Sequence, residues 1–207
     1  MMLKNFIVFE GIDGSGTTTQ IKKLAERFPK EKVFVSAEPT KNETGLFLRR
    51  ILKGEFSVNE KTASFLFAAD RCEHLYGKNG ILEQIQNGKI ALSDRYFFSS
   101  LAYQSVSCGK NFPEHLNSLF PLPEILFYFK INPEISINRV TARGEKTEIY
   151  EKIEFQKKTA NIYDQVINSY KQKEKSQGMK IITIDAEKPI DEISEIIWSS
   201  LKNIPIN

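Results

Sequence analysis

Five short runs of apolar, β-branched or aromatic residues recur along the chain, and polar residues or glycines bound each run. Runs of this length without polar alternation are typical of strands that are buried on both faces of a sheet. The runs predict strands at Phe6–Phe9, Val33–Ala37, Lys89–Ser93, Ile125–Ile131 and Lys180–Ile184.

Between these runs, apolar residues recur every three or four positions, as they do on one face of a helix. The spacing predicts helices around Ile21–Phe28, Phe65–Cys72, Ile81–Ile85, Ile135–Ile137 and Ile193–Ile197. Because strands and helices alternate, we expect an α/β fold in three layers, with a parallel sheet of five strands flanked by helices on both faces.

The segment Arg139–Lys175 departs from this pattern. Its first half, RVTARGEKTEIYEKIEFQKK, is rich in both charges and poor in core residues. Such a segment fits a solvated helix pair and fits equally well a short mobile lid over bound phosphates, here placed at approximately residues 139–156.

Composition limits the class of protein. The chain has 207 residues, of which 41% are hydrophobic and 27% charged, so we expect one domain over residues 1–207. A net charge of +3, with Lys and Arg interleaved with Glu, does not favour nucleic-acid binding. No apolar run is long enough for a membrane span, and the first residues lack the pattern of a signal peptide. We expect a cytoplasmic protein that binds neither nucleic acid nor membrane.

Cysteine and histidine give no metal site in this sequence. Cys72 and Cys108 fit no metal-ligand spacing, and cytosolic thiols stay reduced, so a structural disulfide is not expected. His74 and His115 are isolated and are interpreted as surface or helix residues.

The stretch GIDGSGTTTQ, residues 11–20, follows the first strand and opens a helix, which is the context that a phosphate-binding loop requires. The glycines let backbone N–H groups surround an anion, and the helix N-terminus adds a positive field. The predicted ATP-phosphate-binding residues are Gly11, Gly14, Ser15, Gly16, Thr17, Thr18 and Thr19.

Thr17 stands where this motif calls for lysine. A threonine cannot neutralise a β- or γ-phosphate. Since catalysis of phosphate transfer depends mainly on position and charge stabilisation, another cation must reach the site or turnover must be poor.

Further motifs appear in order along the chain: FEGIDGSG at 9–16, EPT and LRRIL within 38–52, LFAADR at 66–71, SDRYFFSSLAYQ at 93–104, NPEISINRV at 132–140 and TIDA at 183–186. This ordered set resembles the thymidylate kinase family, which transfers phosphate from ATP to dTMP. The resemblance implies the strand order 2-3-1-4-5, ATP as co-substrate, Mg²⁺ as cofactor, and a homodimer for which Phe65 and neighbouring helix faces are candidate contacts.

The resemblance also implies an acceptor site for dTMP. Asp13 would lie near the sugar and the acceptor phosphate, and Arg49 would grip that phosphate with its planar fork of donors. Phe67 and Arg71 are four residues apart and share a helix face, so one can stack on thymine while the other bonds its carbonyl. The predicted dTMP-binding residues are Asp13, Glu38, Pro39, Arg49, Phe67, Arg71, Arg95, Ser100, Tyr103 and Gln104.

Asp94 and Arg95 follow the third predicted strand, where ligands bind in open parallel sheets. The resemblance implies that Thr18 and Asp94 hold Mg²⁺, in part through water, and that Arg95 bridges the donor and acceptor phosphates. It places Ser100 and Gln104 near the thymine, and Tyr103 where a ribose hydroxyl would clash.

Two departures from the family pattern concern the missing lysine. Family members with Gly at position 14 carry a catalytic arginine in the lid, which indicates Arg143, with Arg139 or Lys146 as further candidates, because Glu148 stands at the second arginine position.

Lys130 stands where the family has Asp, at a strand end beside the loop. Lys130 could supply charge that Thr17 lacks, or it could pair with a nearby carboxylate such as Asp13 or Glu10. The predicted catalytic residues are therefore Asp13, Arg95, Arg143 and Lys130.

Three functions remain open at this point. The leading prediction is phosphate transfer from ATP to dTMP, giving dTDP and ADP in dTTP synthesis. The alternatives are another nucleoside monophosphate or deoxynucleoside kinase, and a nucleotide-binding pseudo-kinase that has lost catalysis with the loop lysine.

Overall fold

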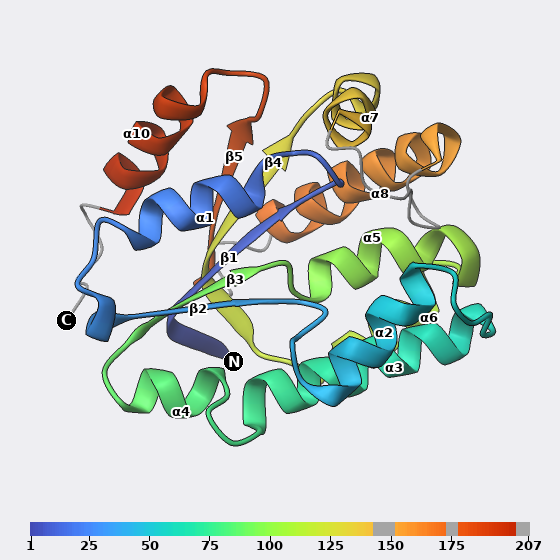
Figure 1. Ribbon diagram of the computed structural model, residues 1–207, viewed down its shortest axis with the longest axis horizontal. Helices are drawn as coiled ribbons and strands as arrows, with labels where there is room; N and C mark the ends of the chain where they lie inside the picture. Colours follow the sequence, from blue (N-terminus) through green and yellow to red (C-terminus); the bar gives the residue numbers. More distant parts are fainter. Residues whose placement is uncertain (143–151, 173–177, 202–207) are drawn as a thin grey trace.

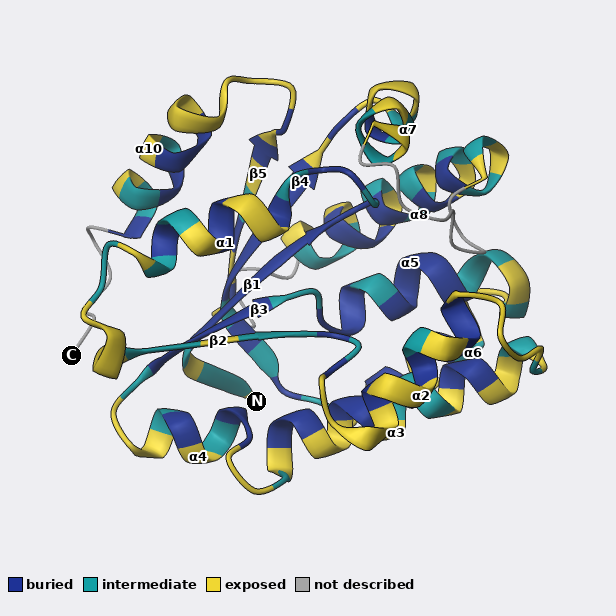
Figure 2. Cartoon of the chain, viewed as in Figure 1, coloured by how far each residue is buried: buried dark blue, intermediate teal, exposed yellow. Residues whose placement is uncertain are grey.

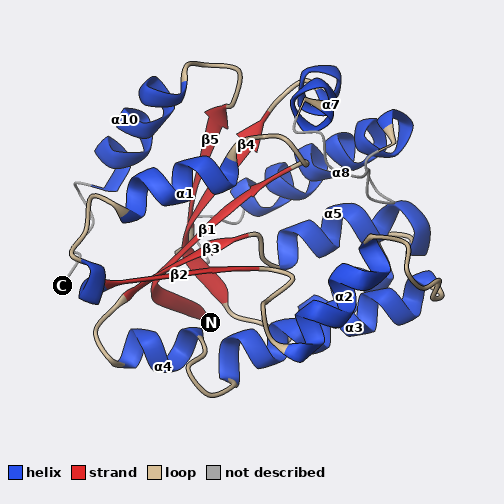
Figure 3. Ribbon diagram, viewed as in Figure 1, coloured by secondary structure: helices blue, strands red, loops and turns tan. Residues whose placement is uncertain are grey.

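The computed structural model describes residues 1–142, 152–172 and 178–201. Its centre is a parallel sheet of five strands in the order β2-β3-β1-β4-β5, which confirms the predicted α/β fold and strand order (Figure 3). The strands are β1 (Met2–Gly11), β2 (Val33–Ala37), β3 (Ile90–Asp94), β4 (Leu122–Lys130) and β5 (Lys180–Asp185).

Helices fill the connections between the strands. They are α1 (Thr17–Ala25), the short 3₁₀ helix η1 (Lys30–Lys32), α2 (Glu43–Leu52), α3 (Glu60–Tyr76), α4 (Ile81–Gln86), α5 (Phe97–Cys108), α6 (Asn111–Asn117), α7 (Pro133–Thr141), α8 (Ile153–Gln172) and α10 (Ile190–Leu201). All five predicted helices are present.

The handedness of the connections assigns the helices to two layers. The chain runs from β1 to β2 in one direction across the sheet, and from β3 through β4 to β5 in the opposite direction. Because such crossovers are right-handed, α1 must cover one face and α5 and α8 the other. The contacts agree, since α1 packs against α10 and α5 packs against α8 (Figure 1).

The reversal of direction falls between β1 and β3, which are neighbours in register, with Phe9 opposite Asp94. The loop after β1 and the residues after β3 therefore emerge side by side at the carboxyl edge. A crevice at such a reversal point is where ligands bind in open α/β sheets.

The core lies on both faces of the central strands, which are almost entirely buried in Figure 2. Phe9 of β1 packs against Phe127 and Phe129 of β4, with ring centroids 5.1 and 5.8 Å apart. This aromatic packing holds β1 rigidly where it leads into the loop.

Two strands, β1 and β4, begin earlier than the sequence predicts, and β4 starts at Leu122 instead of Ile125. β1 starts at Met2 instead of Phe6, because Met2 and Leu3 pair with Leu122 and Pro123 of β4 before an irregularity in the register. The polar Lys4 and Asn5 conceal this extension in the hydrophobic pattern.

Among the described residues, no helix combines the length and apolar character that a membrane crossing requires.

Candidate active site

A cavity of about 390 Å³ opens at the carboxyl ends of β1 and β3. Most of the predicted site residues line it. Five parts of the chain that are separate in sequence bring them together: the loop after β1 with the start of α1, the segment after β2, helix α2, helix α3, and α5 with the residues before it. The predicted residues in its lining are Asp13, Gly14, Gly16, Thr17, Thr18, Thr19, Glu38, Pro39, Arg49, Phe67, Arg71, Asp94, Arg95, Ser100, Tyr103 and Gln104.

The loop after β1 has the backbone shape of a phosphate cradle. Gly14 and Gly16 have positive φ angles of 82° and 94°, and α1 begins directly after Gly16. Gly11 and Ser15 belong to this loop but do not line the cavity. The first N–H groups of α1 are thus directed toward the cavity edge, where a helix N-terminus attracts anions.

Helix α7 packs directly on this loop. The hydroxyl of Ser136, which is fully buried, donates to the backbone carbonyl of Asp13. A Cβ atom at Gly14 would lie 2.4 Å from the carbonyl oxygen of Ser136 and 3.1 Å from Val140. Only glycine fits between the loop and α7, so position 14 cannot carry an arginine in this arrangement.

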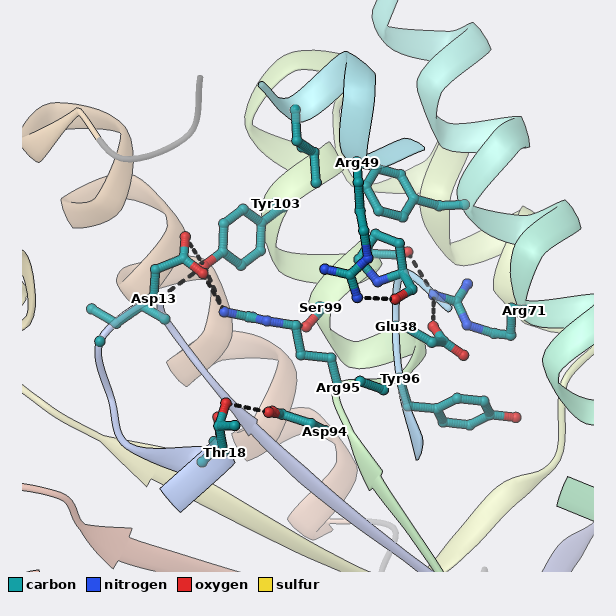
Figure 4. A pocket seen from close by; sticks show the side chains of 18 of the residues that line it. Asp13, Thr18, Glu38, Arg49, Arg71, Asp94, Arg95, Tyr96, Ser99 and Tyr103 are labelled. Carbon is teal, nitrogen blue, oxygen red and sulfur yellow. Dashed lines mark hydrogen bonds and ion pairs between the residues drawn. The ribbon is translucent and has the colours of Figure 1, made fainter. Parts of the chain in front are cut away.

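Asp13 is the centre of a hydrogen-bond network at the loop (Figure 4). Its Oδ1 accepts from Arg95, and its Oδ2 accepts from the Tyr103 hydroxyl at 3.0 Å and from Gln156 Nε2 at 2.9 Å. Arg95 also donates to the carbonyl oxygen of Gly11 at 2.8 Å. The guanidinium of Arg95 therefore lies against the loop that lacks the lysine.

A second carboxylate, Glu10, lies behind Arg95 and is fully buried. It accepts the backbone N–H of Tyr96 at 2.7 Å and that of Ser99 at 3.2 Å, and the hydroxyls of Ser99 at 2.6 Å and Tyr163 at 2.8 Å. Burial raises the pKa of the Glu10 carboxyl from 4.5 to about 7, although these hydrogen bonds and the charge of Arg95 oppose the rise.

At the far end of the cavity, Arg71 is buried in a polar cluster. Its guanidinium donates to Glu38 at 2.6 Å, to Asn117 at 2.5 Å and to Ser100 at 3.0 Å. His74 Nδ1 lies 3.0 Å from the other oxygen of Glu38. His74 is thus a helix residue as predicted, but the surface alternative is wrong, because α3 turns this side chain inward beside Arg71.

Arg49 and Arg50 are adjacent in α2 and point in different directions. Arg49 lines the cavity and donates to the backbone carbonyls of Pro39 and Thr40, and Pro39 follows a cis peptide bond. Arg50 instead pairs with Glu55 at 2.8 Å, away from the cavity lining. The local pattern alone could not separate these two arginines, and the family resemblance was what indicated Arg49.

Lys130 differs from the expectation. Its ammonium pairs with Asp164 of α8 at 2.7 Å. The expected pairing with a nearby carboxylate is confirmed, but Asp13 and Glu10 are wrong as the partners. Lys130 is largely exposed and does not line the cavity at the loop. Its charge is satisfied by a residue that comes from a distant helix, which no local pattern could indicate.

The lid predicted at residues 139–156 is only partly described. Arg139 lies in α7 and donates to the carbonyl of Ala186 at 3.0 Å, and Gln156 lies buried in α8. Arg143, Lys146 and Glu148 lie outside the described residues.

Five residues of the site that the text above describes escaped the sequence-based prediction of its members. Ser99 is one, although it lies in the motif SDRYFFSSLAYQ, and the others are Glu10, Ser136, Gln156 and Tyr163. Glu10 carried one signal, a carboxylate at the end of an otherwise apolar strand. The other three lie on helices whose packing against the loop is a tertiary feature, and nothing in their local sequence marks them.

Comparison with known proteins agrees with this geometry. The family model described as thymidylate kinase matches residues 9–197. The chain belongs to the thymidylate kinase family.

Three relatives whose names contain "thymidylate kinase" illustrate the similarity. A protein of Treponema pallidum (strain Nichols) is 43% identical over 202 residues, covering 97% of this chain and 96% of its own. One of Methanocaldococcus jannaschii is 37% identical over 202 residues, with 97% of each chain covered. One of Leptospira borgpetersenii is 36% identical over 196 residues, covering 91% of this chain and 88% of its own.

The thymidylate kinase family implies a magnesium ion, and the residues here fit one. Thr18 Oγ1 donates to Asp94 Oδ2 at 2.5 Å, and the other carboxylate oxygen of Asp94 is buried with no hydrogen-bond partner among the described residues (Figure 4). A hydroxyl and a carboxylate are the oxygen ligands that Mg²⁺ prefers. The described part of the chain holds no cluster of three or more His, Cys, Asp or Glu that could form a metal cage.

The contact between Gly14 and α7 predicts the effect of a single methyl group. Gly14→Ala should lower the free energy of unfolding by about 2–3 kcal/mol, because strain at positive φ adds to the collision with Ser136. Urea denaturation measures it. Gly16→Ala is the matched control, since its φ is also positive but no atom lies within 4 Å of the added methyl group. Equal losses in the two variants would show that the collision is absent.

The buried carboxyl of Glu10 predicts a pH dependence of stability. Its pKa is higher in the folded protein than in the unfolded chain, so its stability contribution is complete below about pH 4.5 and is lost as the pH rises through 7. Relative to Glu10→Gln, the wild type should therefore lose about 3 kcal/mol of unfolding free energy between pH 4.5 and pH 8. Denaturant titrations of both proteins across this range measure the difference. A difference independent of pH would mean that Glu10 does not titrate there.

Proposed function

We propose that the protein transfers the terminal phosphate of ATP to dTMP, giving dTDP and ADP. The observation that carries the proposal is that one cavity joins two unlike ends. One end has the phosphate loop and Arg95, and the other has the buried Arg71 and Gln104. Transfer of a phosphate from ATP to the phosphate of an acceptor nucleotide needs a cavity that binds phosphates at one end and the acceptor's base at the other.

The unpaired polar atoms at the base end suit thymine. The Nε–H of Arg71 and the Oε1 of Gln104 are buried and have no hydrogen-bond partner among the described residues. Thymine presents a carbonyl oxygen that accepts and an N3–H that donates, so each of these two atoms would gain a partner. Cytosine presents an amino group and an N3 acceptor instead. Its amino N–H would then face the Nε–H of Arg71, and two donors cannot form a hydrogen bond with each other. Phe67 lines the same end and offers a ring for stacking.

The donor end must bind ATP without a loop lysine. Loop N–H groups and the N-terminus of α1 would hold its phosphates, and Thr18 and Asp94 would hold Mg²⁺, which neutralises phosphate charge when bound. Arg95, the cation that contacts the loop in the described part of the chain, would stabilise the phosphoryl group in transit.

The acceptor phosphate would lie between Arg49 and Arg95, with Asp13 and Tyr103 beside the sugar. An oxygen of the dTMP phosphate attacks the γ-phosphate directly, so no covalent enzyme intermediate and no strong general base are needed. The ring of Tyr103 would leave no room for a ribose hydroxyl. Closure of the predicted lid, with Arg143 as its cation, would exclude water.

A homodimer and a cytoplasmic location complete the proposal. Phe65 is 56% exposed on α3 and packs edge-to-face on Phe112 of α6, with centroids 5.5 Å apart. An exposed aromatic side chain such as Phe65 is common at interfaces, and the family resemblance implies a dimer formed through helices.

An assay of ADP release with candidate acceptors tests the function. With ATP and Mg²⁺, dTMP should be the preferred acceptor, and kcat/KM for dCMP should be at least about 100-fold lower, because cytosine leaves Arg71 facing a donor. Thymidine should not be phosphorylated, since it lacks the phosphate that Arg49 and Arg95 bind. Binding of both nucleotides without any dTDP would instead support a pseudo-kinase, and turnover of thymidine a nucleoside kinase.

The interface proposal predicts that Phe65→Glu dissociates the dimer. A charge buried in an apolar contact is costly, so sedimentation at micromolar concentration should change from dimer to monomer. Leu119→Glu is the control, because Leu119 is 81% exposed and lies outside α3 and α6. A wild-type protein that is already monomeric, or a Phe65→Glu variant that stays dimeric, would contradict the proposed interface.

A further inference from the structure

Arg95 is held in place by its backbone as well as by its side chain. Its φ angle is +74°, a left-handed conformation that is rare outside glycine and is often stored at functional sites. Its N–H donates to the Phe9 carbonyl at 2.9 Å, and its own carbonyl accepts from the Ser93 hydroxyl at 2.7 Å. β1 and β3 therefore fix the point from which this side chain starts.

The guanidinium is then held from two sides. On the cavity side, Arg95 bonds Asp13 and the Gly11 carbonyl. On the buried side, its Nη1 donates to the Ser99 hydroxyl at 3.1 Å and makes a longer contact of 3.5 Å with the Tyr163 hydroxyl. Asp13 and Ser99 line the cavity and Tyr163 does not, so the contact with Tyr163 is out of reach of a substrate phosphate and would keep the arginine in position during turnover.

Glu10 decides which way the two hydroxyls on the buried side point. Ser99 and Tyr163 each carry one hydroxyl hydrogen. Both hydroxyls lie within hydrogen-bond distance of the same oxygen of Glu10, Oε2, and of each other at 2.8 Å. An ionised carboxylate can only accept, so both hydroxyls donate to Oε2 when Glu10 is ionised. Their lone pairs are therefore left to face Arg95. The other oxygen of Glu10 accepts the N–H groups of Tyr96 and Ser99 at the start of α5, so the carboxyl cannot rotate without losing them.

Glu10 and Tyr163 do not line the cavity. They lie outside the cavity in which substrate would bind, and their hydrogen bond joins β1 to α8 behind Arg95. We propose that Glu10 and Tyr163 are positioning residues for the phosphate-transfer step. They hold the guanidinium of Arg95 against the loop, where it stands in for the missing lysine. This inference rests on the proposed function.

The amide of glutamine gives a sharp test because it fits the same space with a different polarity. In Glu10→Gln the amide oxygen must accept the backbone N–H groups of α5, so the NH₂ group faces Ser99 and Tyr163. Both hydroxyls then accept from it. One hydroxyl can donate to the other, because they lie 2.8 Å apart, and the hydrogen of the second then turns toward Arg95, which has only donors. Arg95 loses at least one acceptor while the fold and the charge of the cavity lining are kept.

Two measurements test the proposal in the full-length protein. The first follows hydrogen exchange of the Arg95 guanidinium by NMR, which needs no acceptor substrate. The Arg95 signals should be protected in the wild type and should exchange at least about tenfold faster in Glu10→Gln and Tyr163→Phe. The second measures ADP release with dTMP. The kcat should fall about 10-fold to 100-fold in both variants, with both KM values within about threefold of the wild type.

Tyr170→Phe is the matched control. Tyr170 lies on the same helix, its ring packs on Phe98, and its hydroxyl makes no hydrogen bond to a described residue. This variant should behave like the wild type in both measurements. In an Arg95→Ala background, Tyr163→Phe should change kcat by less than about twofold, because Tyr163 acts on the reaction only through Arg95.

The outcomes separate this inference from the proposed function. Arg95 exchange that is equal in the wild type, Glu10→Gln and Tyr163→Phe would overturn the inference, whatever the acceptor. A kcat that falls only in proportion to lost folded protein, or an undiminished effect of Tyr163→Phe without Arg95, would overturn it as well. A wild-type protein with a protected Arg95 and no dTDP formation would count against the proposed function alone.

Discussion

The site depends on a buried carboxylate at the end of a central strand. Taking the Glu10 side chain out of water is costly unless its oxygens are hydrogen-bonded, and here four donors from α5, the residues before it, and α8 converge on it. The same bonds fix how α5 and α8 approach β1. Helix α5 carries Ser100, Tyr103 and Gln104, and α8 carries Gln156, so the acceptor side of the cavity takes its position from the strand that leads into the phosphate loop.

Two features answer the loss of the loop lysine at Thr17. The cradle itself keeps its shape, with Gly14 and Gly16 at positive φ and α7 clamped on the loop through Ser136. A phosphate-binding cradle of backbone N–H groups does not require a side-chain charge to form. The positive charge that the lysine would have supplied has to come from another residue. Arg95 is the candidate, because it contacts the loop at Gly11 and Asp13. An arginine at this place suits phosphate, because its fork of donors spreads over several oxygens.

Much of the fold follows from local pattern. Strands that are apolar on both faces must be covered by helices on both sides, and the spaced apolar residues of the helices provide the faces that cover them. The loop could be recognised from its spacing and context, and the family resemblance indicated the Phe67–Arg71 pair, one helical turn apart. Neither could predict the contacts between distant elements. The partner of Lys130 comes from α8, the inward turn of His74 depends on Glu38 after β2, and Arg49 differs from Arg50 only through its packing on Pro39. Tyr163 gave no local signal, because its role depends on a hydrogen bond to Glu10 of β1, which is distant in sequence.

The claim on which the account rests is that Arg95 supplies the charge that the loop lacks. The single-turnover rate of phosphate transfer from ATP to dTMP, compared among the wild type, Arg95→Lys and Thr17→Lys, tests it most directly. A rate that falls about 10²-fold to 10³-fold in Arg95→Lys and changes less than about tenfold in Thr17→Lys is the predicted result. An Arg95→Lys rate within about threefold of the wild type, or a wild-type rate that only Thr17→Lys makes measurable, would contradict the account.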